Sequence, residues 1–420
     1  MIGPLIDILK SSSFKAWLLS FYVFIWFLQV GNRIGFLGTI RIEFLVGAVL
    51  AALAINQIIS NKDKTNYGYD SFINSIYLLY GVFVIYTLFS FDGDHSSNIF
   101  FDRIIKFSMF TLFIGVLVRN KQELVLVLLG FLLAMAKIIQ EGVFGVVTGG
   151  MVWQNQGIPR LHGVTKLYRH PNSLSGLAVS ALPFFLFLFR FQTRIMKLAF
   201  LGAIAGLLVV VMYTGSRTGY VATFILCSAI LLRLGIFKFR TIITVVLIAV
   251  VGAILIPQDY KDRFGTMFKS EEERGSSANK RMEILEDAWA IFKKHPMGVG
   301  VQAFPAVRDL EFGRKQDTHN LYLEILTNLG PIGFVAFWTF IILLFKTNRK
   351  SRKVLLGKNQ HFLAELCYII NLYILCRLAL GLFGMDLYEV YWWFAAGFTI
   401  VLAKFAVSSE NIPIVEDKQK

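Results

Sequence analysis

Long apolar runs separated by short polar segments make up most of this 420-residue chain. A helix needs about 20 apolar residues to cross the roughly 30 Å hydrocarbon core of a bilayer, and twelve windows approach or reach that length. They are residues 16–31, 40–59, 72–91, 104–118, 123–142, 173–190, 195–213, 218–234, 241–257, 320–345, 361–383 and 387–406. The pattern predicts an all-α polytopic membrane protein with about twelve transmembrane helices.

These windows divide the chain into four parts. They are transmembrane helices 1–9 in residues 1–257, one long loop in 258–319, transmembrane helices 10–12 in 320–406 and a short tail in 407–420. Within the long loop, residues 279–294 show helical periodicity. Four apolar residues form one stripe of this segment, with charged residues opposite: Met282, Leu285, Trp289 and Phe292. We expect an amphipathic helix that lies on the membrane or caps the bundle.

Basic residues gather between alternate apolar windows. If the amino terminus is cytoplasmic, every cytoplasmic loop is net positive and contains one of the Lys and Arg clusters at 62–64, 119–121, 190–197, 233–240 and 346–353. The long loop and the acidic segment 92–102 then fall on the other side. This arrangement follows the positive-inside rule. We therefore predict that both termini are cytoplasmic and that the long loop is on the opposite face.

Composition supports the membrane assignment and excludes one class of partner. The chain is 56% hydrophobic and 16% charged, with a mean hydropathy of +0.62, whereas soluble domains are about 25% charged. A formal net charge of +15 would suit nucleic acid. Because the basic residues sit in topology-setting clusters, we expect membrane lipid around the protein and no nucleic-acid partner.

The unusual polar motifs all fall on the predicted non-cytoplasmic side. Arg217 lies in a glycine-flanked turn between two apolar windows, where a cation opposes the preferred orientation. Its planar guanidinium suits a phosphate, although an arginine that only anchors a helix end fits too. Because Arg281 and either Arg160 or Arg169 share this side, we interpret the group as an anion site.

His319 is the second candidate. Asp317 or Thr318 can cap a helix that begins here, which would place His319 in the first turn. The helix N-terminus and the nearby arginines disfavour another positive charge, so the imidazole should be neutral and able to accept a proton from a hydroxyl group. The alternative is a hydrogen-bonded histidine at a helix start. His162, His170 and Asn320 are further candidates that could line the same opening of the site on the non-cytoplasmic side.

We expect neither a metal nor a cofactor. The chain has no HExxH motif and no cysteine or carboxylate cluster in the motif loops. Asp317 and Glu283 are the alternative ligands for Mg²⁺, but the arginines would compete with the ion for the same phosphate charge.

Four motifs together resemble the O-antigen ligase and O-antigen polymerase superfamily over about residues 160–335. They are RLHG…RHPNSLSG at 160–176, GSRTGY at 215–220, Ser277-x-x-x-Arg281 followed by HPMGVG at 295–300, and THNLYLEILTNLGPIG at 318–333. The first five windows resemble the family only in hydropathy. The segment Tyr168-Arg169-His170 departs from the family pattern, so roles for Arg169 and His170 rest on the residues alone.

The resemblance implies a bacterial inner-membrane glycosyltransferase of the GT-C type, with its active site at the periplasmic face. Such an enzyme passes a glycan from undecaprenyl diphosphate to an acceptor sugar, without a metal and with inversion. In this chain Arg217 and Arg281 would bind the diphosphate, and His319 would be the general base. We expect an O-antigen ligase whose acceptor is lipid A–core.

Two alternatives remain open from the sequence. A polymerase of the same superfamily would use another carrier-bound repeat unit as acceptor. A lipid-linked glycan transporter would bind the diphosphate without cleaving it, but it should line a midplane pathway with polar residues. The motifs here gather at one face instead.

Overall fold

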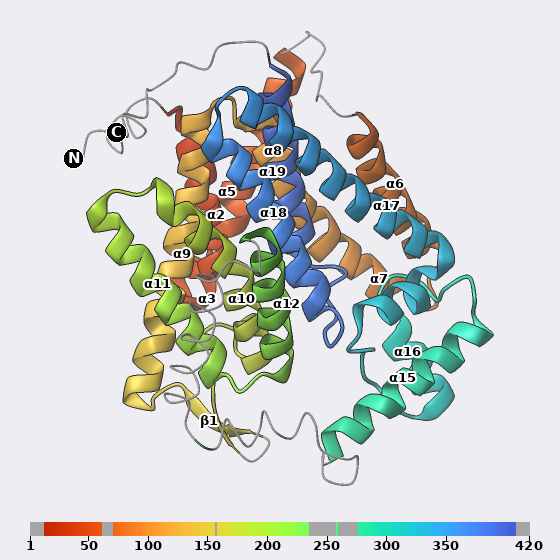
Figure 1. Cartoon of the computed structure of the whole chain (residues 1–420). Helices are drawn as coiled ribbons and strands as arrows, with labels where there is room; N and C mark the ends of the chain where they lie inside the picture. Colours follow the sequence, from red (N-terminus) through yellow and green to blue (C-terminus); the bar gives the residue numbers. More distant parts are fainter. Residues whose placement is uncertain (1–11, 61–69, 156–157, 235–257, 259–275, 409–420) are drawn as a thin grey trace.

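The computed structural model describes residues 12–60, 70–155, 158–234, 258 and 276–408 (Figure 1). Within these residues, eight helices are long and apolar enough to cross a membrane. They are α5 (Ile42–Ser60), α6 (Asp70–Leu88), α9 (Lys121–Thr148), α10 (Pro171–Leu188), α11 (Arg194–Tyr213), α17 (Leu321–Gly357), α18 (His361–Leu380) and α19 (Val390–Val407). The protein is a multi-pass α-helical membrane protein.

Three further helices occupy predicted windows. They are α2 (Phe14–Leu28), α8 (Lys106–Leu117) and α12 (Arg217–Leu234). The predicted ninth span, 241–257, lies outside the described residues. A helix therefore covers each predicted window that the structure describes, while the total of twelve spans and the GT-C assignment stay predictions.

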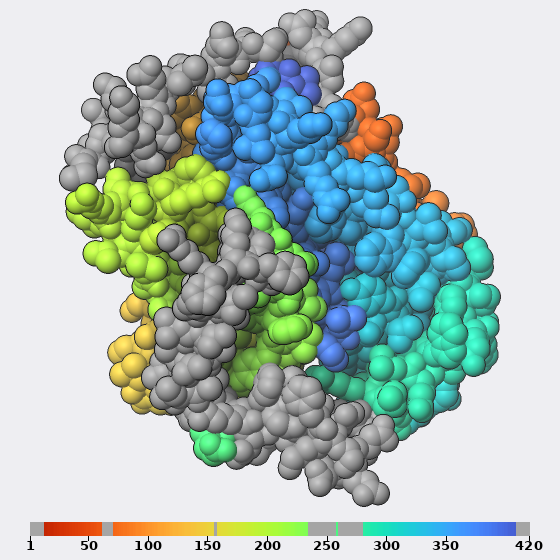
Figure 2. Space-filling model, viewed as in Figure 1, coloured from red at the N-terminus to blue at the C-terminus, as the bar shows by residue number. Residues whose placement is uncertain are grey.

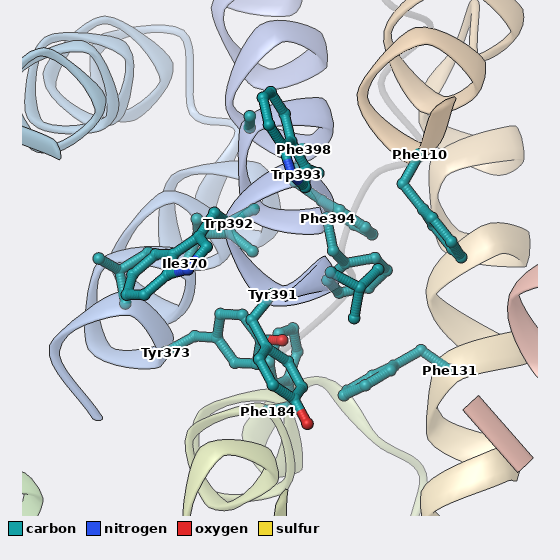
Figure 3. Packing of buried hydrophobic residues seen from close by; sticks show 14 of the residues in the cluster. Phe110, Phe131, Phe184, Ile370, Tyr373, Tyr391, Trp392, Trp393, Phe394 and Phe398 are labelled. Atoms are coloured by element: carbon teal, nitrogen blue, oxygen red, sulfur yellow. The ribbon is translucent and has the colours of Figure 1, made fainter. Parts of the chain in front are cut away.

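Aromatic side chains build the centre of the bundle. Helix α19 is almost entirely buried, whereas α5 and α11 leave most of their surface at the perimeter. The ring of Phe394 in α19 lies 5.1 Å from that of Phe131 and 4.9 Å from that of Phe398 (Figure 3). The ring of Phe27 in α2 also lies 5.1 Å from that of Phe394. Rings at such spacings make favourable edge and tilted contacts, which fix the packing of α2, α9 and α19.

Short elements connect the long helices. They are α3 (Val30–Arg33), α4 (Gly35–Thr39), α7 (Gly93–Ile99), the π-helix η1 (Phe100–Ile105), the hairpin strands β1 (Val152–Asn155) and β2 (Ile158–Leu161), η2 (Phe189–Phe191), α15 (Ser276–Lys294) and α16 (Phe304–Phe312). The antiparallel pair β1–β2 was not predicted; it pairs Val152 with Leu161.

The predicted amphipathic helix exists as α15, but its protein-facing side is not the predicted stripe. Met282 and Trp289 are 52% and 48% exposed, whereas Ile284, Ala288 and Ile291 are buried. Ala288 and Ile291 pack in a small second core with residues of the 299–307 segment and α16. The charged side of the helix can face the protein because its buried acid, Asp287, pairs with an arginine of α16.

The HPMGVG motif stabilises a break in α17 at Gly330 and Pro331. Proline has no N–H group, so the carbonyl of Thr327 loses the donor that a continuous helix would supply. The backbone N–H of Val299 takes its place at 2.8 Å, and that of Gly300 donates to Asn328 O at 2.9 Å. Gly300 has φ 112°, and a Cβ there would collide with Ser90, so only glycine fits this contact. This motif has a structural role.

The motif-bearing loops all lie at one end of the bundle. The β1–β2 hairpin, α15 and α16 are found there (Figure 1), and α15 with α16 forms one edge of that end (Figure 2). At the opposite end Arg190 and Arg233, which belong to two of the predicted basic clusters, meet Glu365. Which end faces the cytoplasm stays a prediction.

Candidate functional site

The turn that carries Arg217 joins α11 to α12. Gly215 adopts φ 55°, a left-handed conformation that glycine tolerates best. The Ser216 hydroxyl accepts a hydrogen bond from Gly219 N at 3.2 Å. Arg217 is the first residue of α12. The backbone therefore presents Arg217 at a helix N-terminus, where the helix dipole adds to the attraction for an anion.

Arg160 supports this turn from the side. Its side chain is 1% exposed. Nε donates to Thr214 O at 2.7 Å, and Nη2 donates to Asn172 Oδ1 at 2.8 Å. These bonds connect the hairpin, the α11–α12 turn and the start of α10. Arg160 thus positions the site, and its guanidinium is already engaged by protein oxygens.

Arg281 reaches the same region from α15. It lies three residues before Ile284, on the inward face of the helix, and its side chain is partly buried. Burial and the neighbouring Arg217 guanidinium lower the pKa of Arg281. Both groups stay protonated near neutrality, so the protein holds two like charges side by side. A bound anion would relieve that repulsion.

His319 lies just before α17 and not in its first turn, so the predicted cap was wrong. The N-cap is Asn320, whose Oδ1 accepts from the N–H groups of Tyr322 and Leu323 at 3.0 Å. His319 itself has φ 49°, a conformation that is uncommon for residues other than glycine and recurs at functional sites.

The surroundings of His319 keep its imidazole neutral. Burial and the nearby Arg281 lower the pKa of His319, while the Asp317 carboxylate partly opposes them. A neutral imidazole has a free lone pair and can accept a proton. The structure therefore brings together the predicted base and a predicted anion-binding arginine.

Asn320 secures this segment. Besides capping α17, its Nδ2 donates to Leu382 O at 3.1 Å. The next residue adds a bond from Leu321 N to Gly381 O at 2.8 Å. The α18–α19 turn thus supports the strained backbone at His319, a contribution that sequence reasoning missed because it joins segments 60 residues apart.

His170 belongs to the same electrostatic group. Partial burial and the nearby Arg160, His319 and Arg281 lower its pKa. Its Nδ1 accepts from Asn172 N at 3.2 Å and so caps α10. That bond requires an unprotonated Nδ1, in agreement with the lowered pKa.

His162 and Arg169 are less directly connected to this group. The His162 ring stacks on Trp153 of the hairpin at 4.6 Å, and its Nδ1 lies 3.1 Å from Gly163 O. Arg169 has an exposed side chain immediately before His170. The structure shows no contact of either side chain with His319 or Arg281 among the residues that it describes.

Three residues that act on His319 or Asp317 had no sequence signal: Arg308, Arg103 and His95. Arg308, which is fully buried in α16, also lowers the pKa of His319. Burial raises the pKa of Asp317, while His319, Arg103 and His95 act in the opposite direction. Arg103 and His95 come from η1 and α7, more than 200 residues earlier in the chain. Only the fold brings them to the mouth.

Comparison with known families gives two matches. Residues 202–338 match the O-antigen ligase family, and this segment contains Arg217, Arg281 and His319. The chain carries an O-antigen ligase domain. Residues 5–193 match a family of unknown function, and no curated protein matches the chain significantly.

The O-antigen ligase domain confirms the resemblance inferred from the motifs. A domain of this family implies a glycosyltransferase-type enzyme that uses lipid-linked glycans. The other candidates, Arg160, His162, Arg169 and His170, lie in the segment that matches the family of unknown function. The mouth of the site therefore combines residues from both matched segments.

Proposed function

We propose that this protein is an O-antigen ligase that transfers a glycan from undecaprenyl diphosphate to a lipid A–core sugar. The observation that carries the proposal is the convergence of Arg217, Arg281 and His319 at one end of the bundle, within the O-antigen ligase domain. The arginines supply the charge for a diphosphate, and the neutral histidine supplies a base.

The chemistry follows from these roles. The acceptor hydroxyl attacks the anomeric carbon, and the bond from that carbon to the phosphate oxygen breaks. His319 takes the proton of the hydroxyl, while Arg217 and Arg281 stabilise the negative charge that develops on the leaving diphosphate. Attack opposite the leaving group inverts the anomeric centre. No step of this proposal uses a metal ion.

We place the site at the periplasmic face of the bacterial inner membrane, with both termini cytoplasmic. The separation of motif loops and basic loops at opposite ends supports this orientation. In a variant without the exposed Cys227, a cysteine at exposed Leu310 should react with an impermeant thiol reagent in intact cells. A cysteine at exposed Lys353 should react only after permeabilisation. The reverse result would place the site in the cytoplasm.

A defined transfer reaction tests the activity. Purified protein should convert carrier-linked glycan and lipid A–core into a conjugate, and it should leave the donor unchanged when lipid A–core is omitted. A polymerase would instead lengthen the carrier-linked glycan without any acceptor lipid. A transporter would form neither product, and this outcome would contradict the proposal.

A further inference from the structure

A second group of arginines surrounds one buried carboxylate at the end of the bundle opposite the proposed active site. Glu365 of α18 has a side chain that is 3% exposed. Arg190 Nη2 lies 2.6 Å from its Oε2, and Arg233 donates to both of its oxygens at 2.5 and 2.9 Å. One carboxylate is therefore shared by two guanidinium groups.

A third arginine joins the group, and no carboxylate of the described residues forms an ion pair with it. Arg352 of α17 lies with its guanidinium 5.9 Å from the ring centre of Tyr368, and Arg233 lies 4.0 Å from the same ring. The Nε of Arg352 is buried, and it has no hydrogen-bond partner among the described residues. Among the residues that the structure describes, these three guanidinium groups share one carboxylate, which leaves an excess of two positive charges.

Such an excess of charge next to apolar rings is costly unless an anion is present. The group lies on predicted basic loops at a helix end, and the Arg190 side chain is 53% exposed. At this depth the abundant anion is the phosphate of membrane phospholipids, which basic pockets between transmembrane helices bind. Tyr368 and Phe187 border Arg233 with apolar surface suited to the acyl-chain side of a lipid.

We propose that Arg190, Arg233 and Arg352 bind the phosphate of an anionic phospholipid in the adjacent leaflet. The site differs from the proposed diphosphate site, which lies at the other end of the bundle. Arg233 is in the last turn of α12, whose first residue is Arg217. A lipid bound here contacts α12, α17 and α18 at once, and so stabilises the position of α12, the helix that begins with Arg217.

Arg352→Met is the informative variant. It keeps an apolar stem and removes one charge, and it leaves both arginines on Glu365 in place. Lys353→Met is the matched control, because Lys353 is the next residue of α17 and is exposed. Removing Arg233 would be less informative, since it would leave Glu365 buried with only one partner.

The experiment adds phosphatidylglycerol, phosphatidylcholine or inorganic phosphate to delipidated protein in detergent. Melting temperature and native mass spectrometry report binding. Phosphatidylglycerol should raise the melting temperature of the parent and of Lys353→Met, and phosphatidylcholine should do so much less. Arg352→Met should bind phosphatidylglycerol about ten-fold more weakly, as expected for one lost charge-assisted contact.

Two results would overturn the proposal. Equal loss of binding in Arg352→Met and Lys353→Met would show general attraction to a basic surface and no built site. An equal response to inorganic phosphate would show that the lipid is not required. If Arg352→Met melts at a lower temperature without lipid, the mass-spectrometric binding constant of its folded fraction still decides the question.

Discussion

Replacing Asp287 with leucine should detach α15 from α16 and displace Arg281. Asp287 is 5% exposed. Its Oδ2 lies 2.9 Å from Arg308 Nε and 2.8 Å from Arg308 Nη2, and its Oδ1 lies 3.1 Å from Arg314 Nη2. Arg308 is fully buried, and among the described residues it would keep only the hydrogen bond to Gln316, at 3.4 Å. Removing one partner of a buried pair costs about 3–5 kcal/mol.

That cost corresponds to a fall of roughly 10²- to 10⁴-fold in the ratio of docked to undocked α15. Hydrogen exchange at the amides of 284–291 should accelerate, and donor binding should weaken because Arg281 is on this helix. Glu283→Leu is the matched control. Glu283 pairs with the same Arg314 one turn earlier, but its side chain is 45% exposed, so its loss should cost at most about 1 kcal/mol.

The double variant Asp287→Leu with Arg308→Met should recover most of the protection, because no buried charge is left unpaired. The reasoning would be refuted if Asp287→Leu exchanged its α15 amides and bound donor like Glu283→Leu. In that case α15 would be held by Ile284, Ala288 and Ile291 alone.

Three further predictions concern the site. Arg217→Ala and Arg281→Ala should each abolish transfer in protein that is still inserted in the membrane. Lysine at either position should restore little activity, because it lacks the paired donors of arginine. Normal turnover in both alanine variants would show that these arginines only anchor helix ends. Asp317→Asn removes the carboxylate that raises the pKa of His319; the acid limb of the kcat/KM profile should therefore move to lower pH, and a shift to higher pH would contradict this. Activity of the purified protein should survive EDTA, and loss on chelation with recovery on adding a divalent ion would assign Mg²⁺ a role.

The helices were predictable because their signals are local, whereas the roles of the candidate site residues stay predictions. Apolar windows mark the spans, and Arg217, Arg281 and His319 stand in short motifs that run against the charge pattern of their side. Which face of α15 packs against the protein was not predictable, because it depends on the ion pair between Asp287 and Arg308. The supporting role of Arg160 likewise depends on Thr214, which lies 54 residues away in the sequence.

The predicted N-cap of α17 was wrong for a related reason. Asp317, Thr318 and Asn320 are all common N-cap residues, and local sequence does not choose among them. The bonds from Asn320 to Leu382 O and from Leu321 N to Gly381 O decide the start of the helix. Those partners belong to the α18–α19 turn, so the choice is made by tertiary contacts.

The measurement that tests the central claim most directly compares donor binding and transfer in His319→Ala. Both should be measured on one preparation of purified protein with the carrier-linked glycan as donor. We predict donor binding close to that of the parent and transfer slower by at least about 10²-fold, the smaller effect typical of a lost general base. If donor binding is lost while bound donor still reacts at the parental rate, His319 is a diphosphate ligand and the base lies elsewhere.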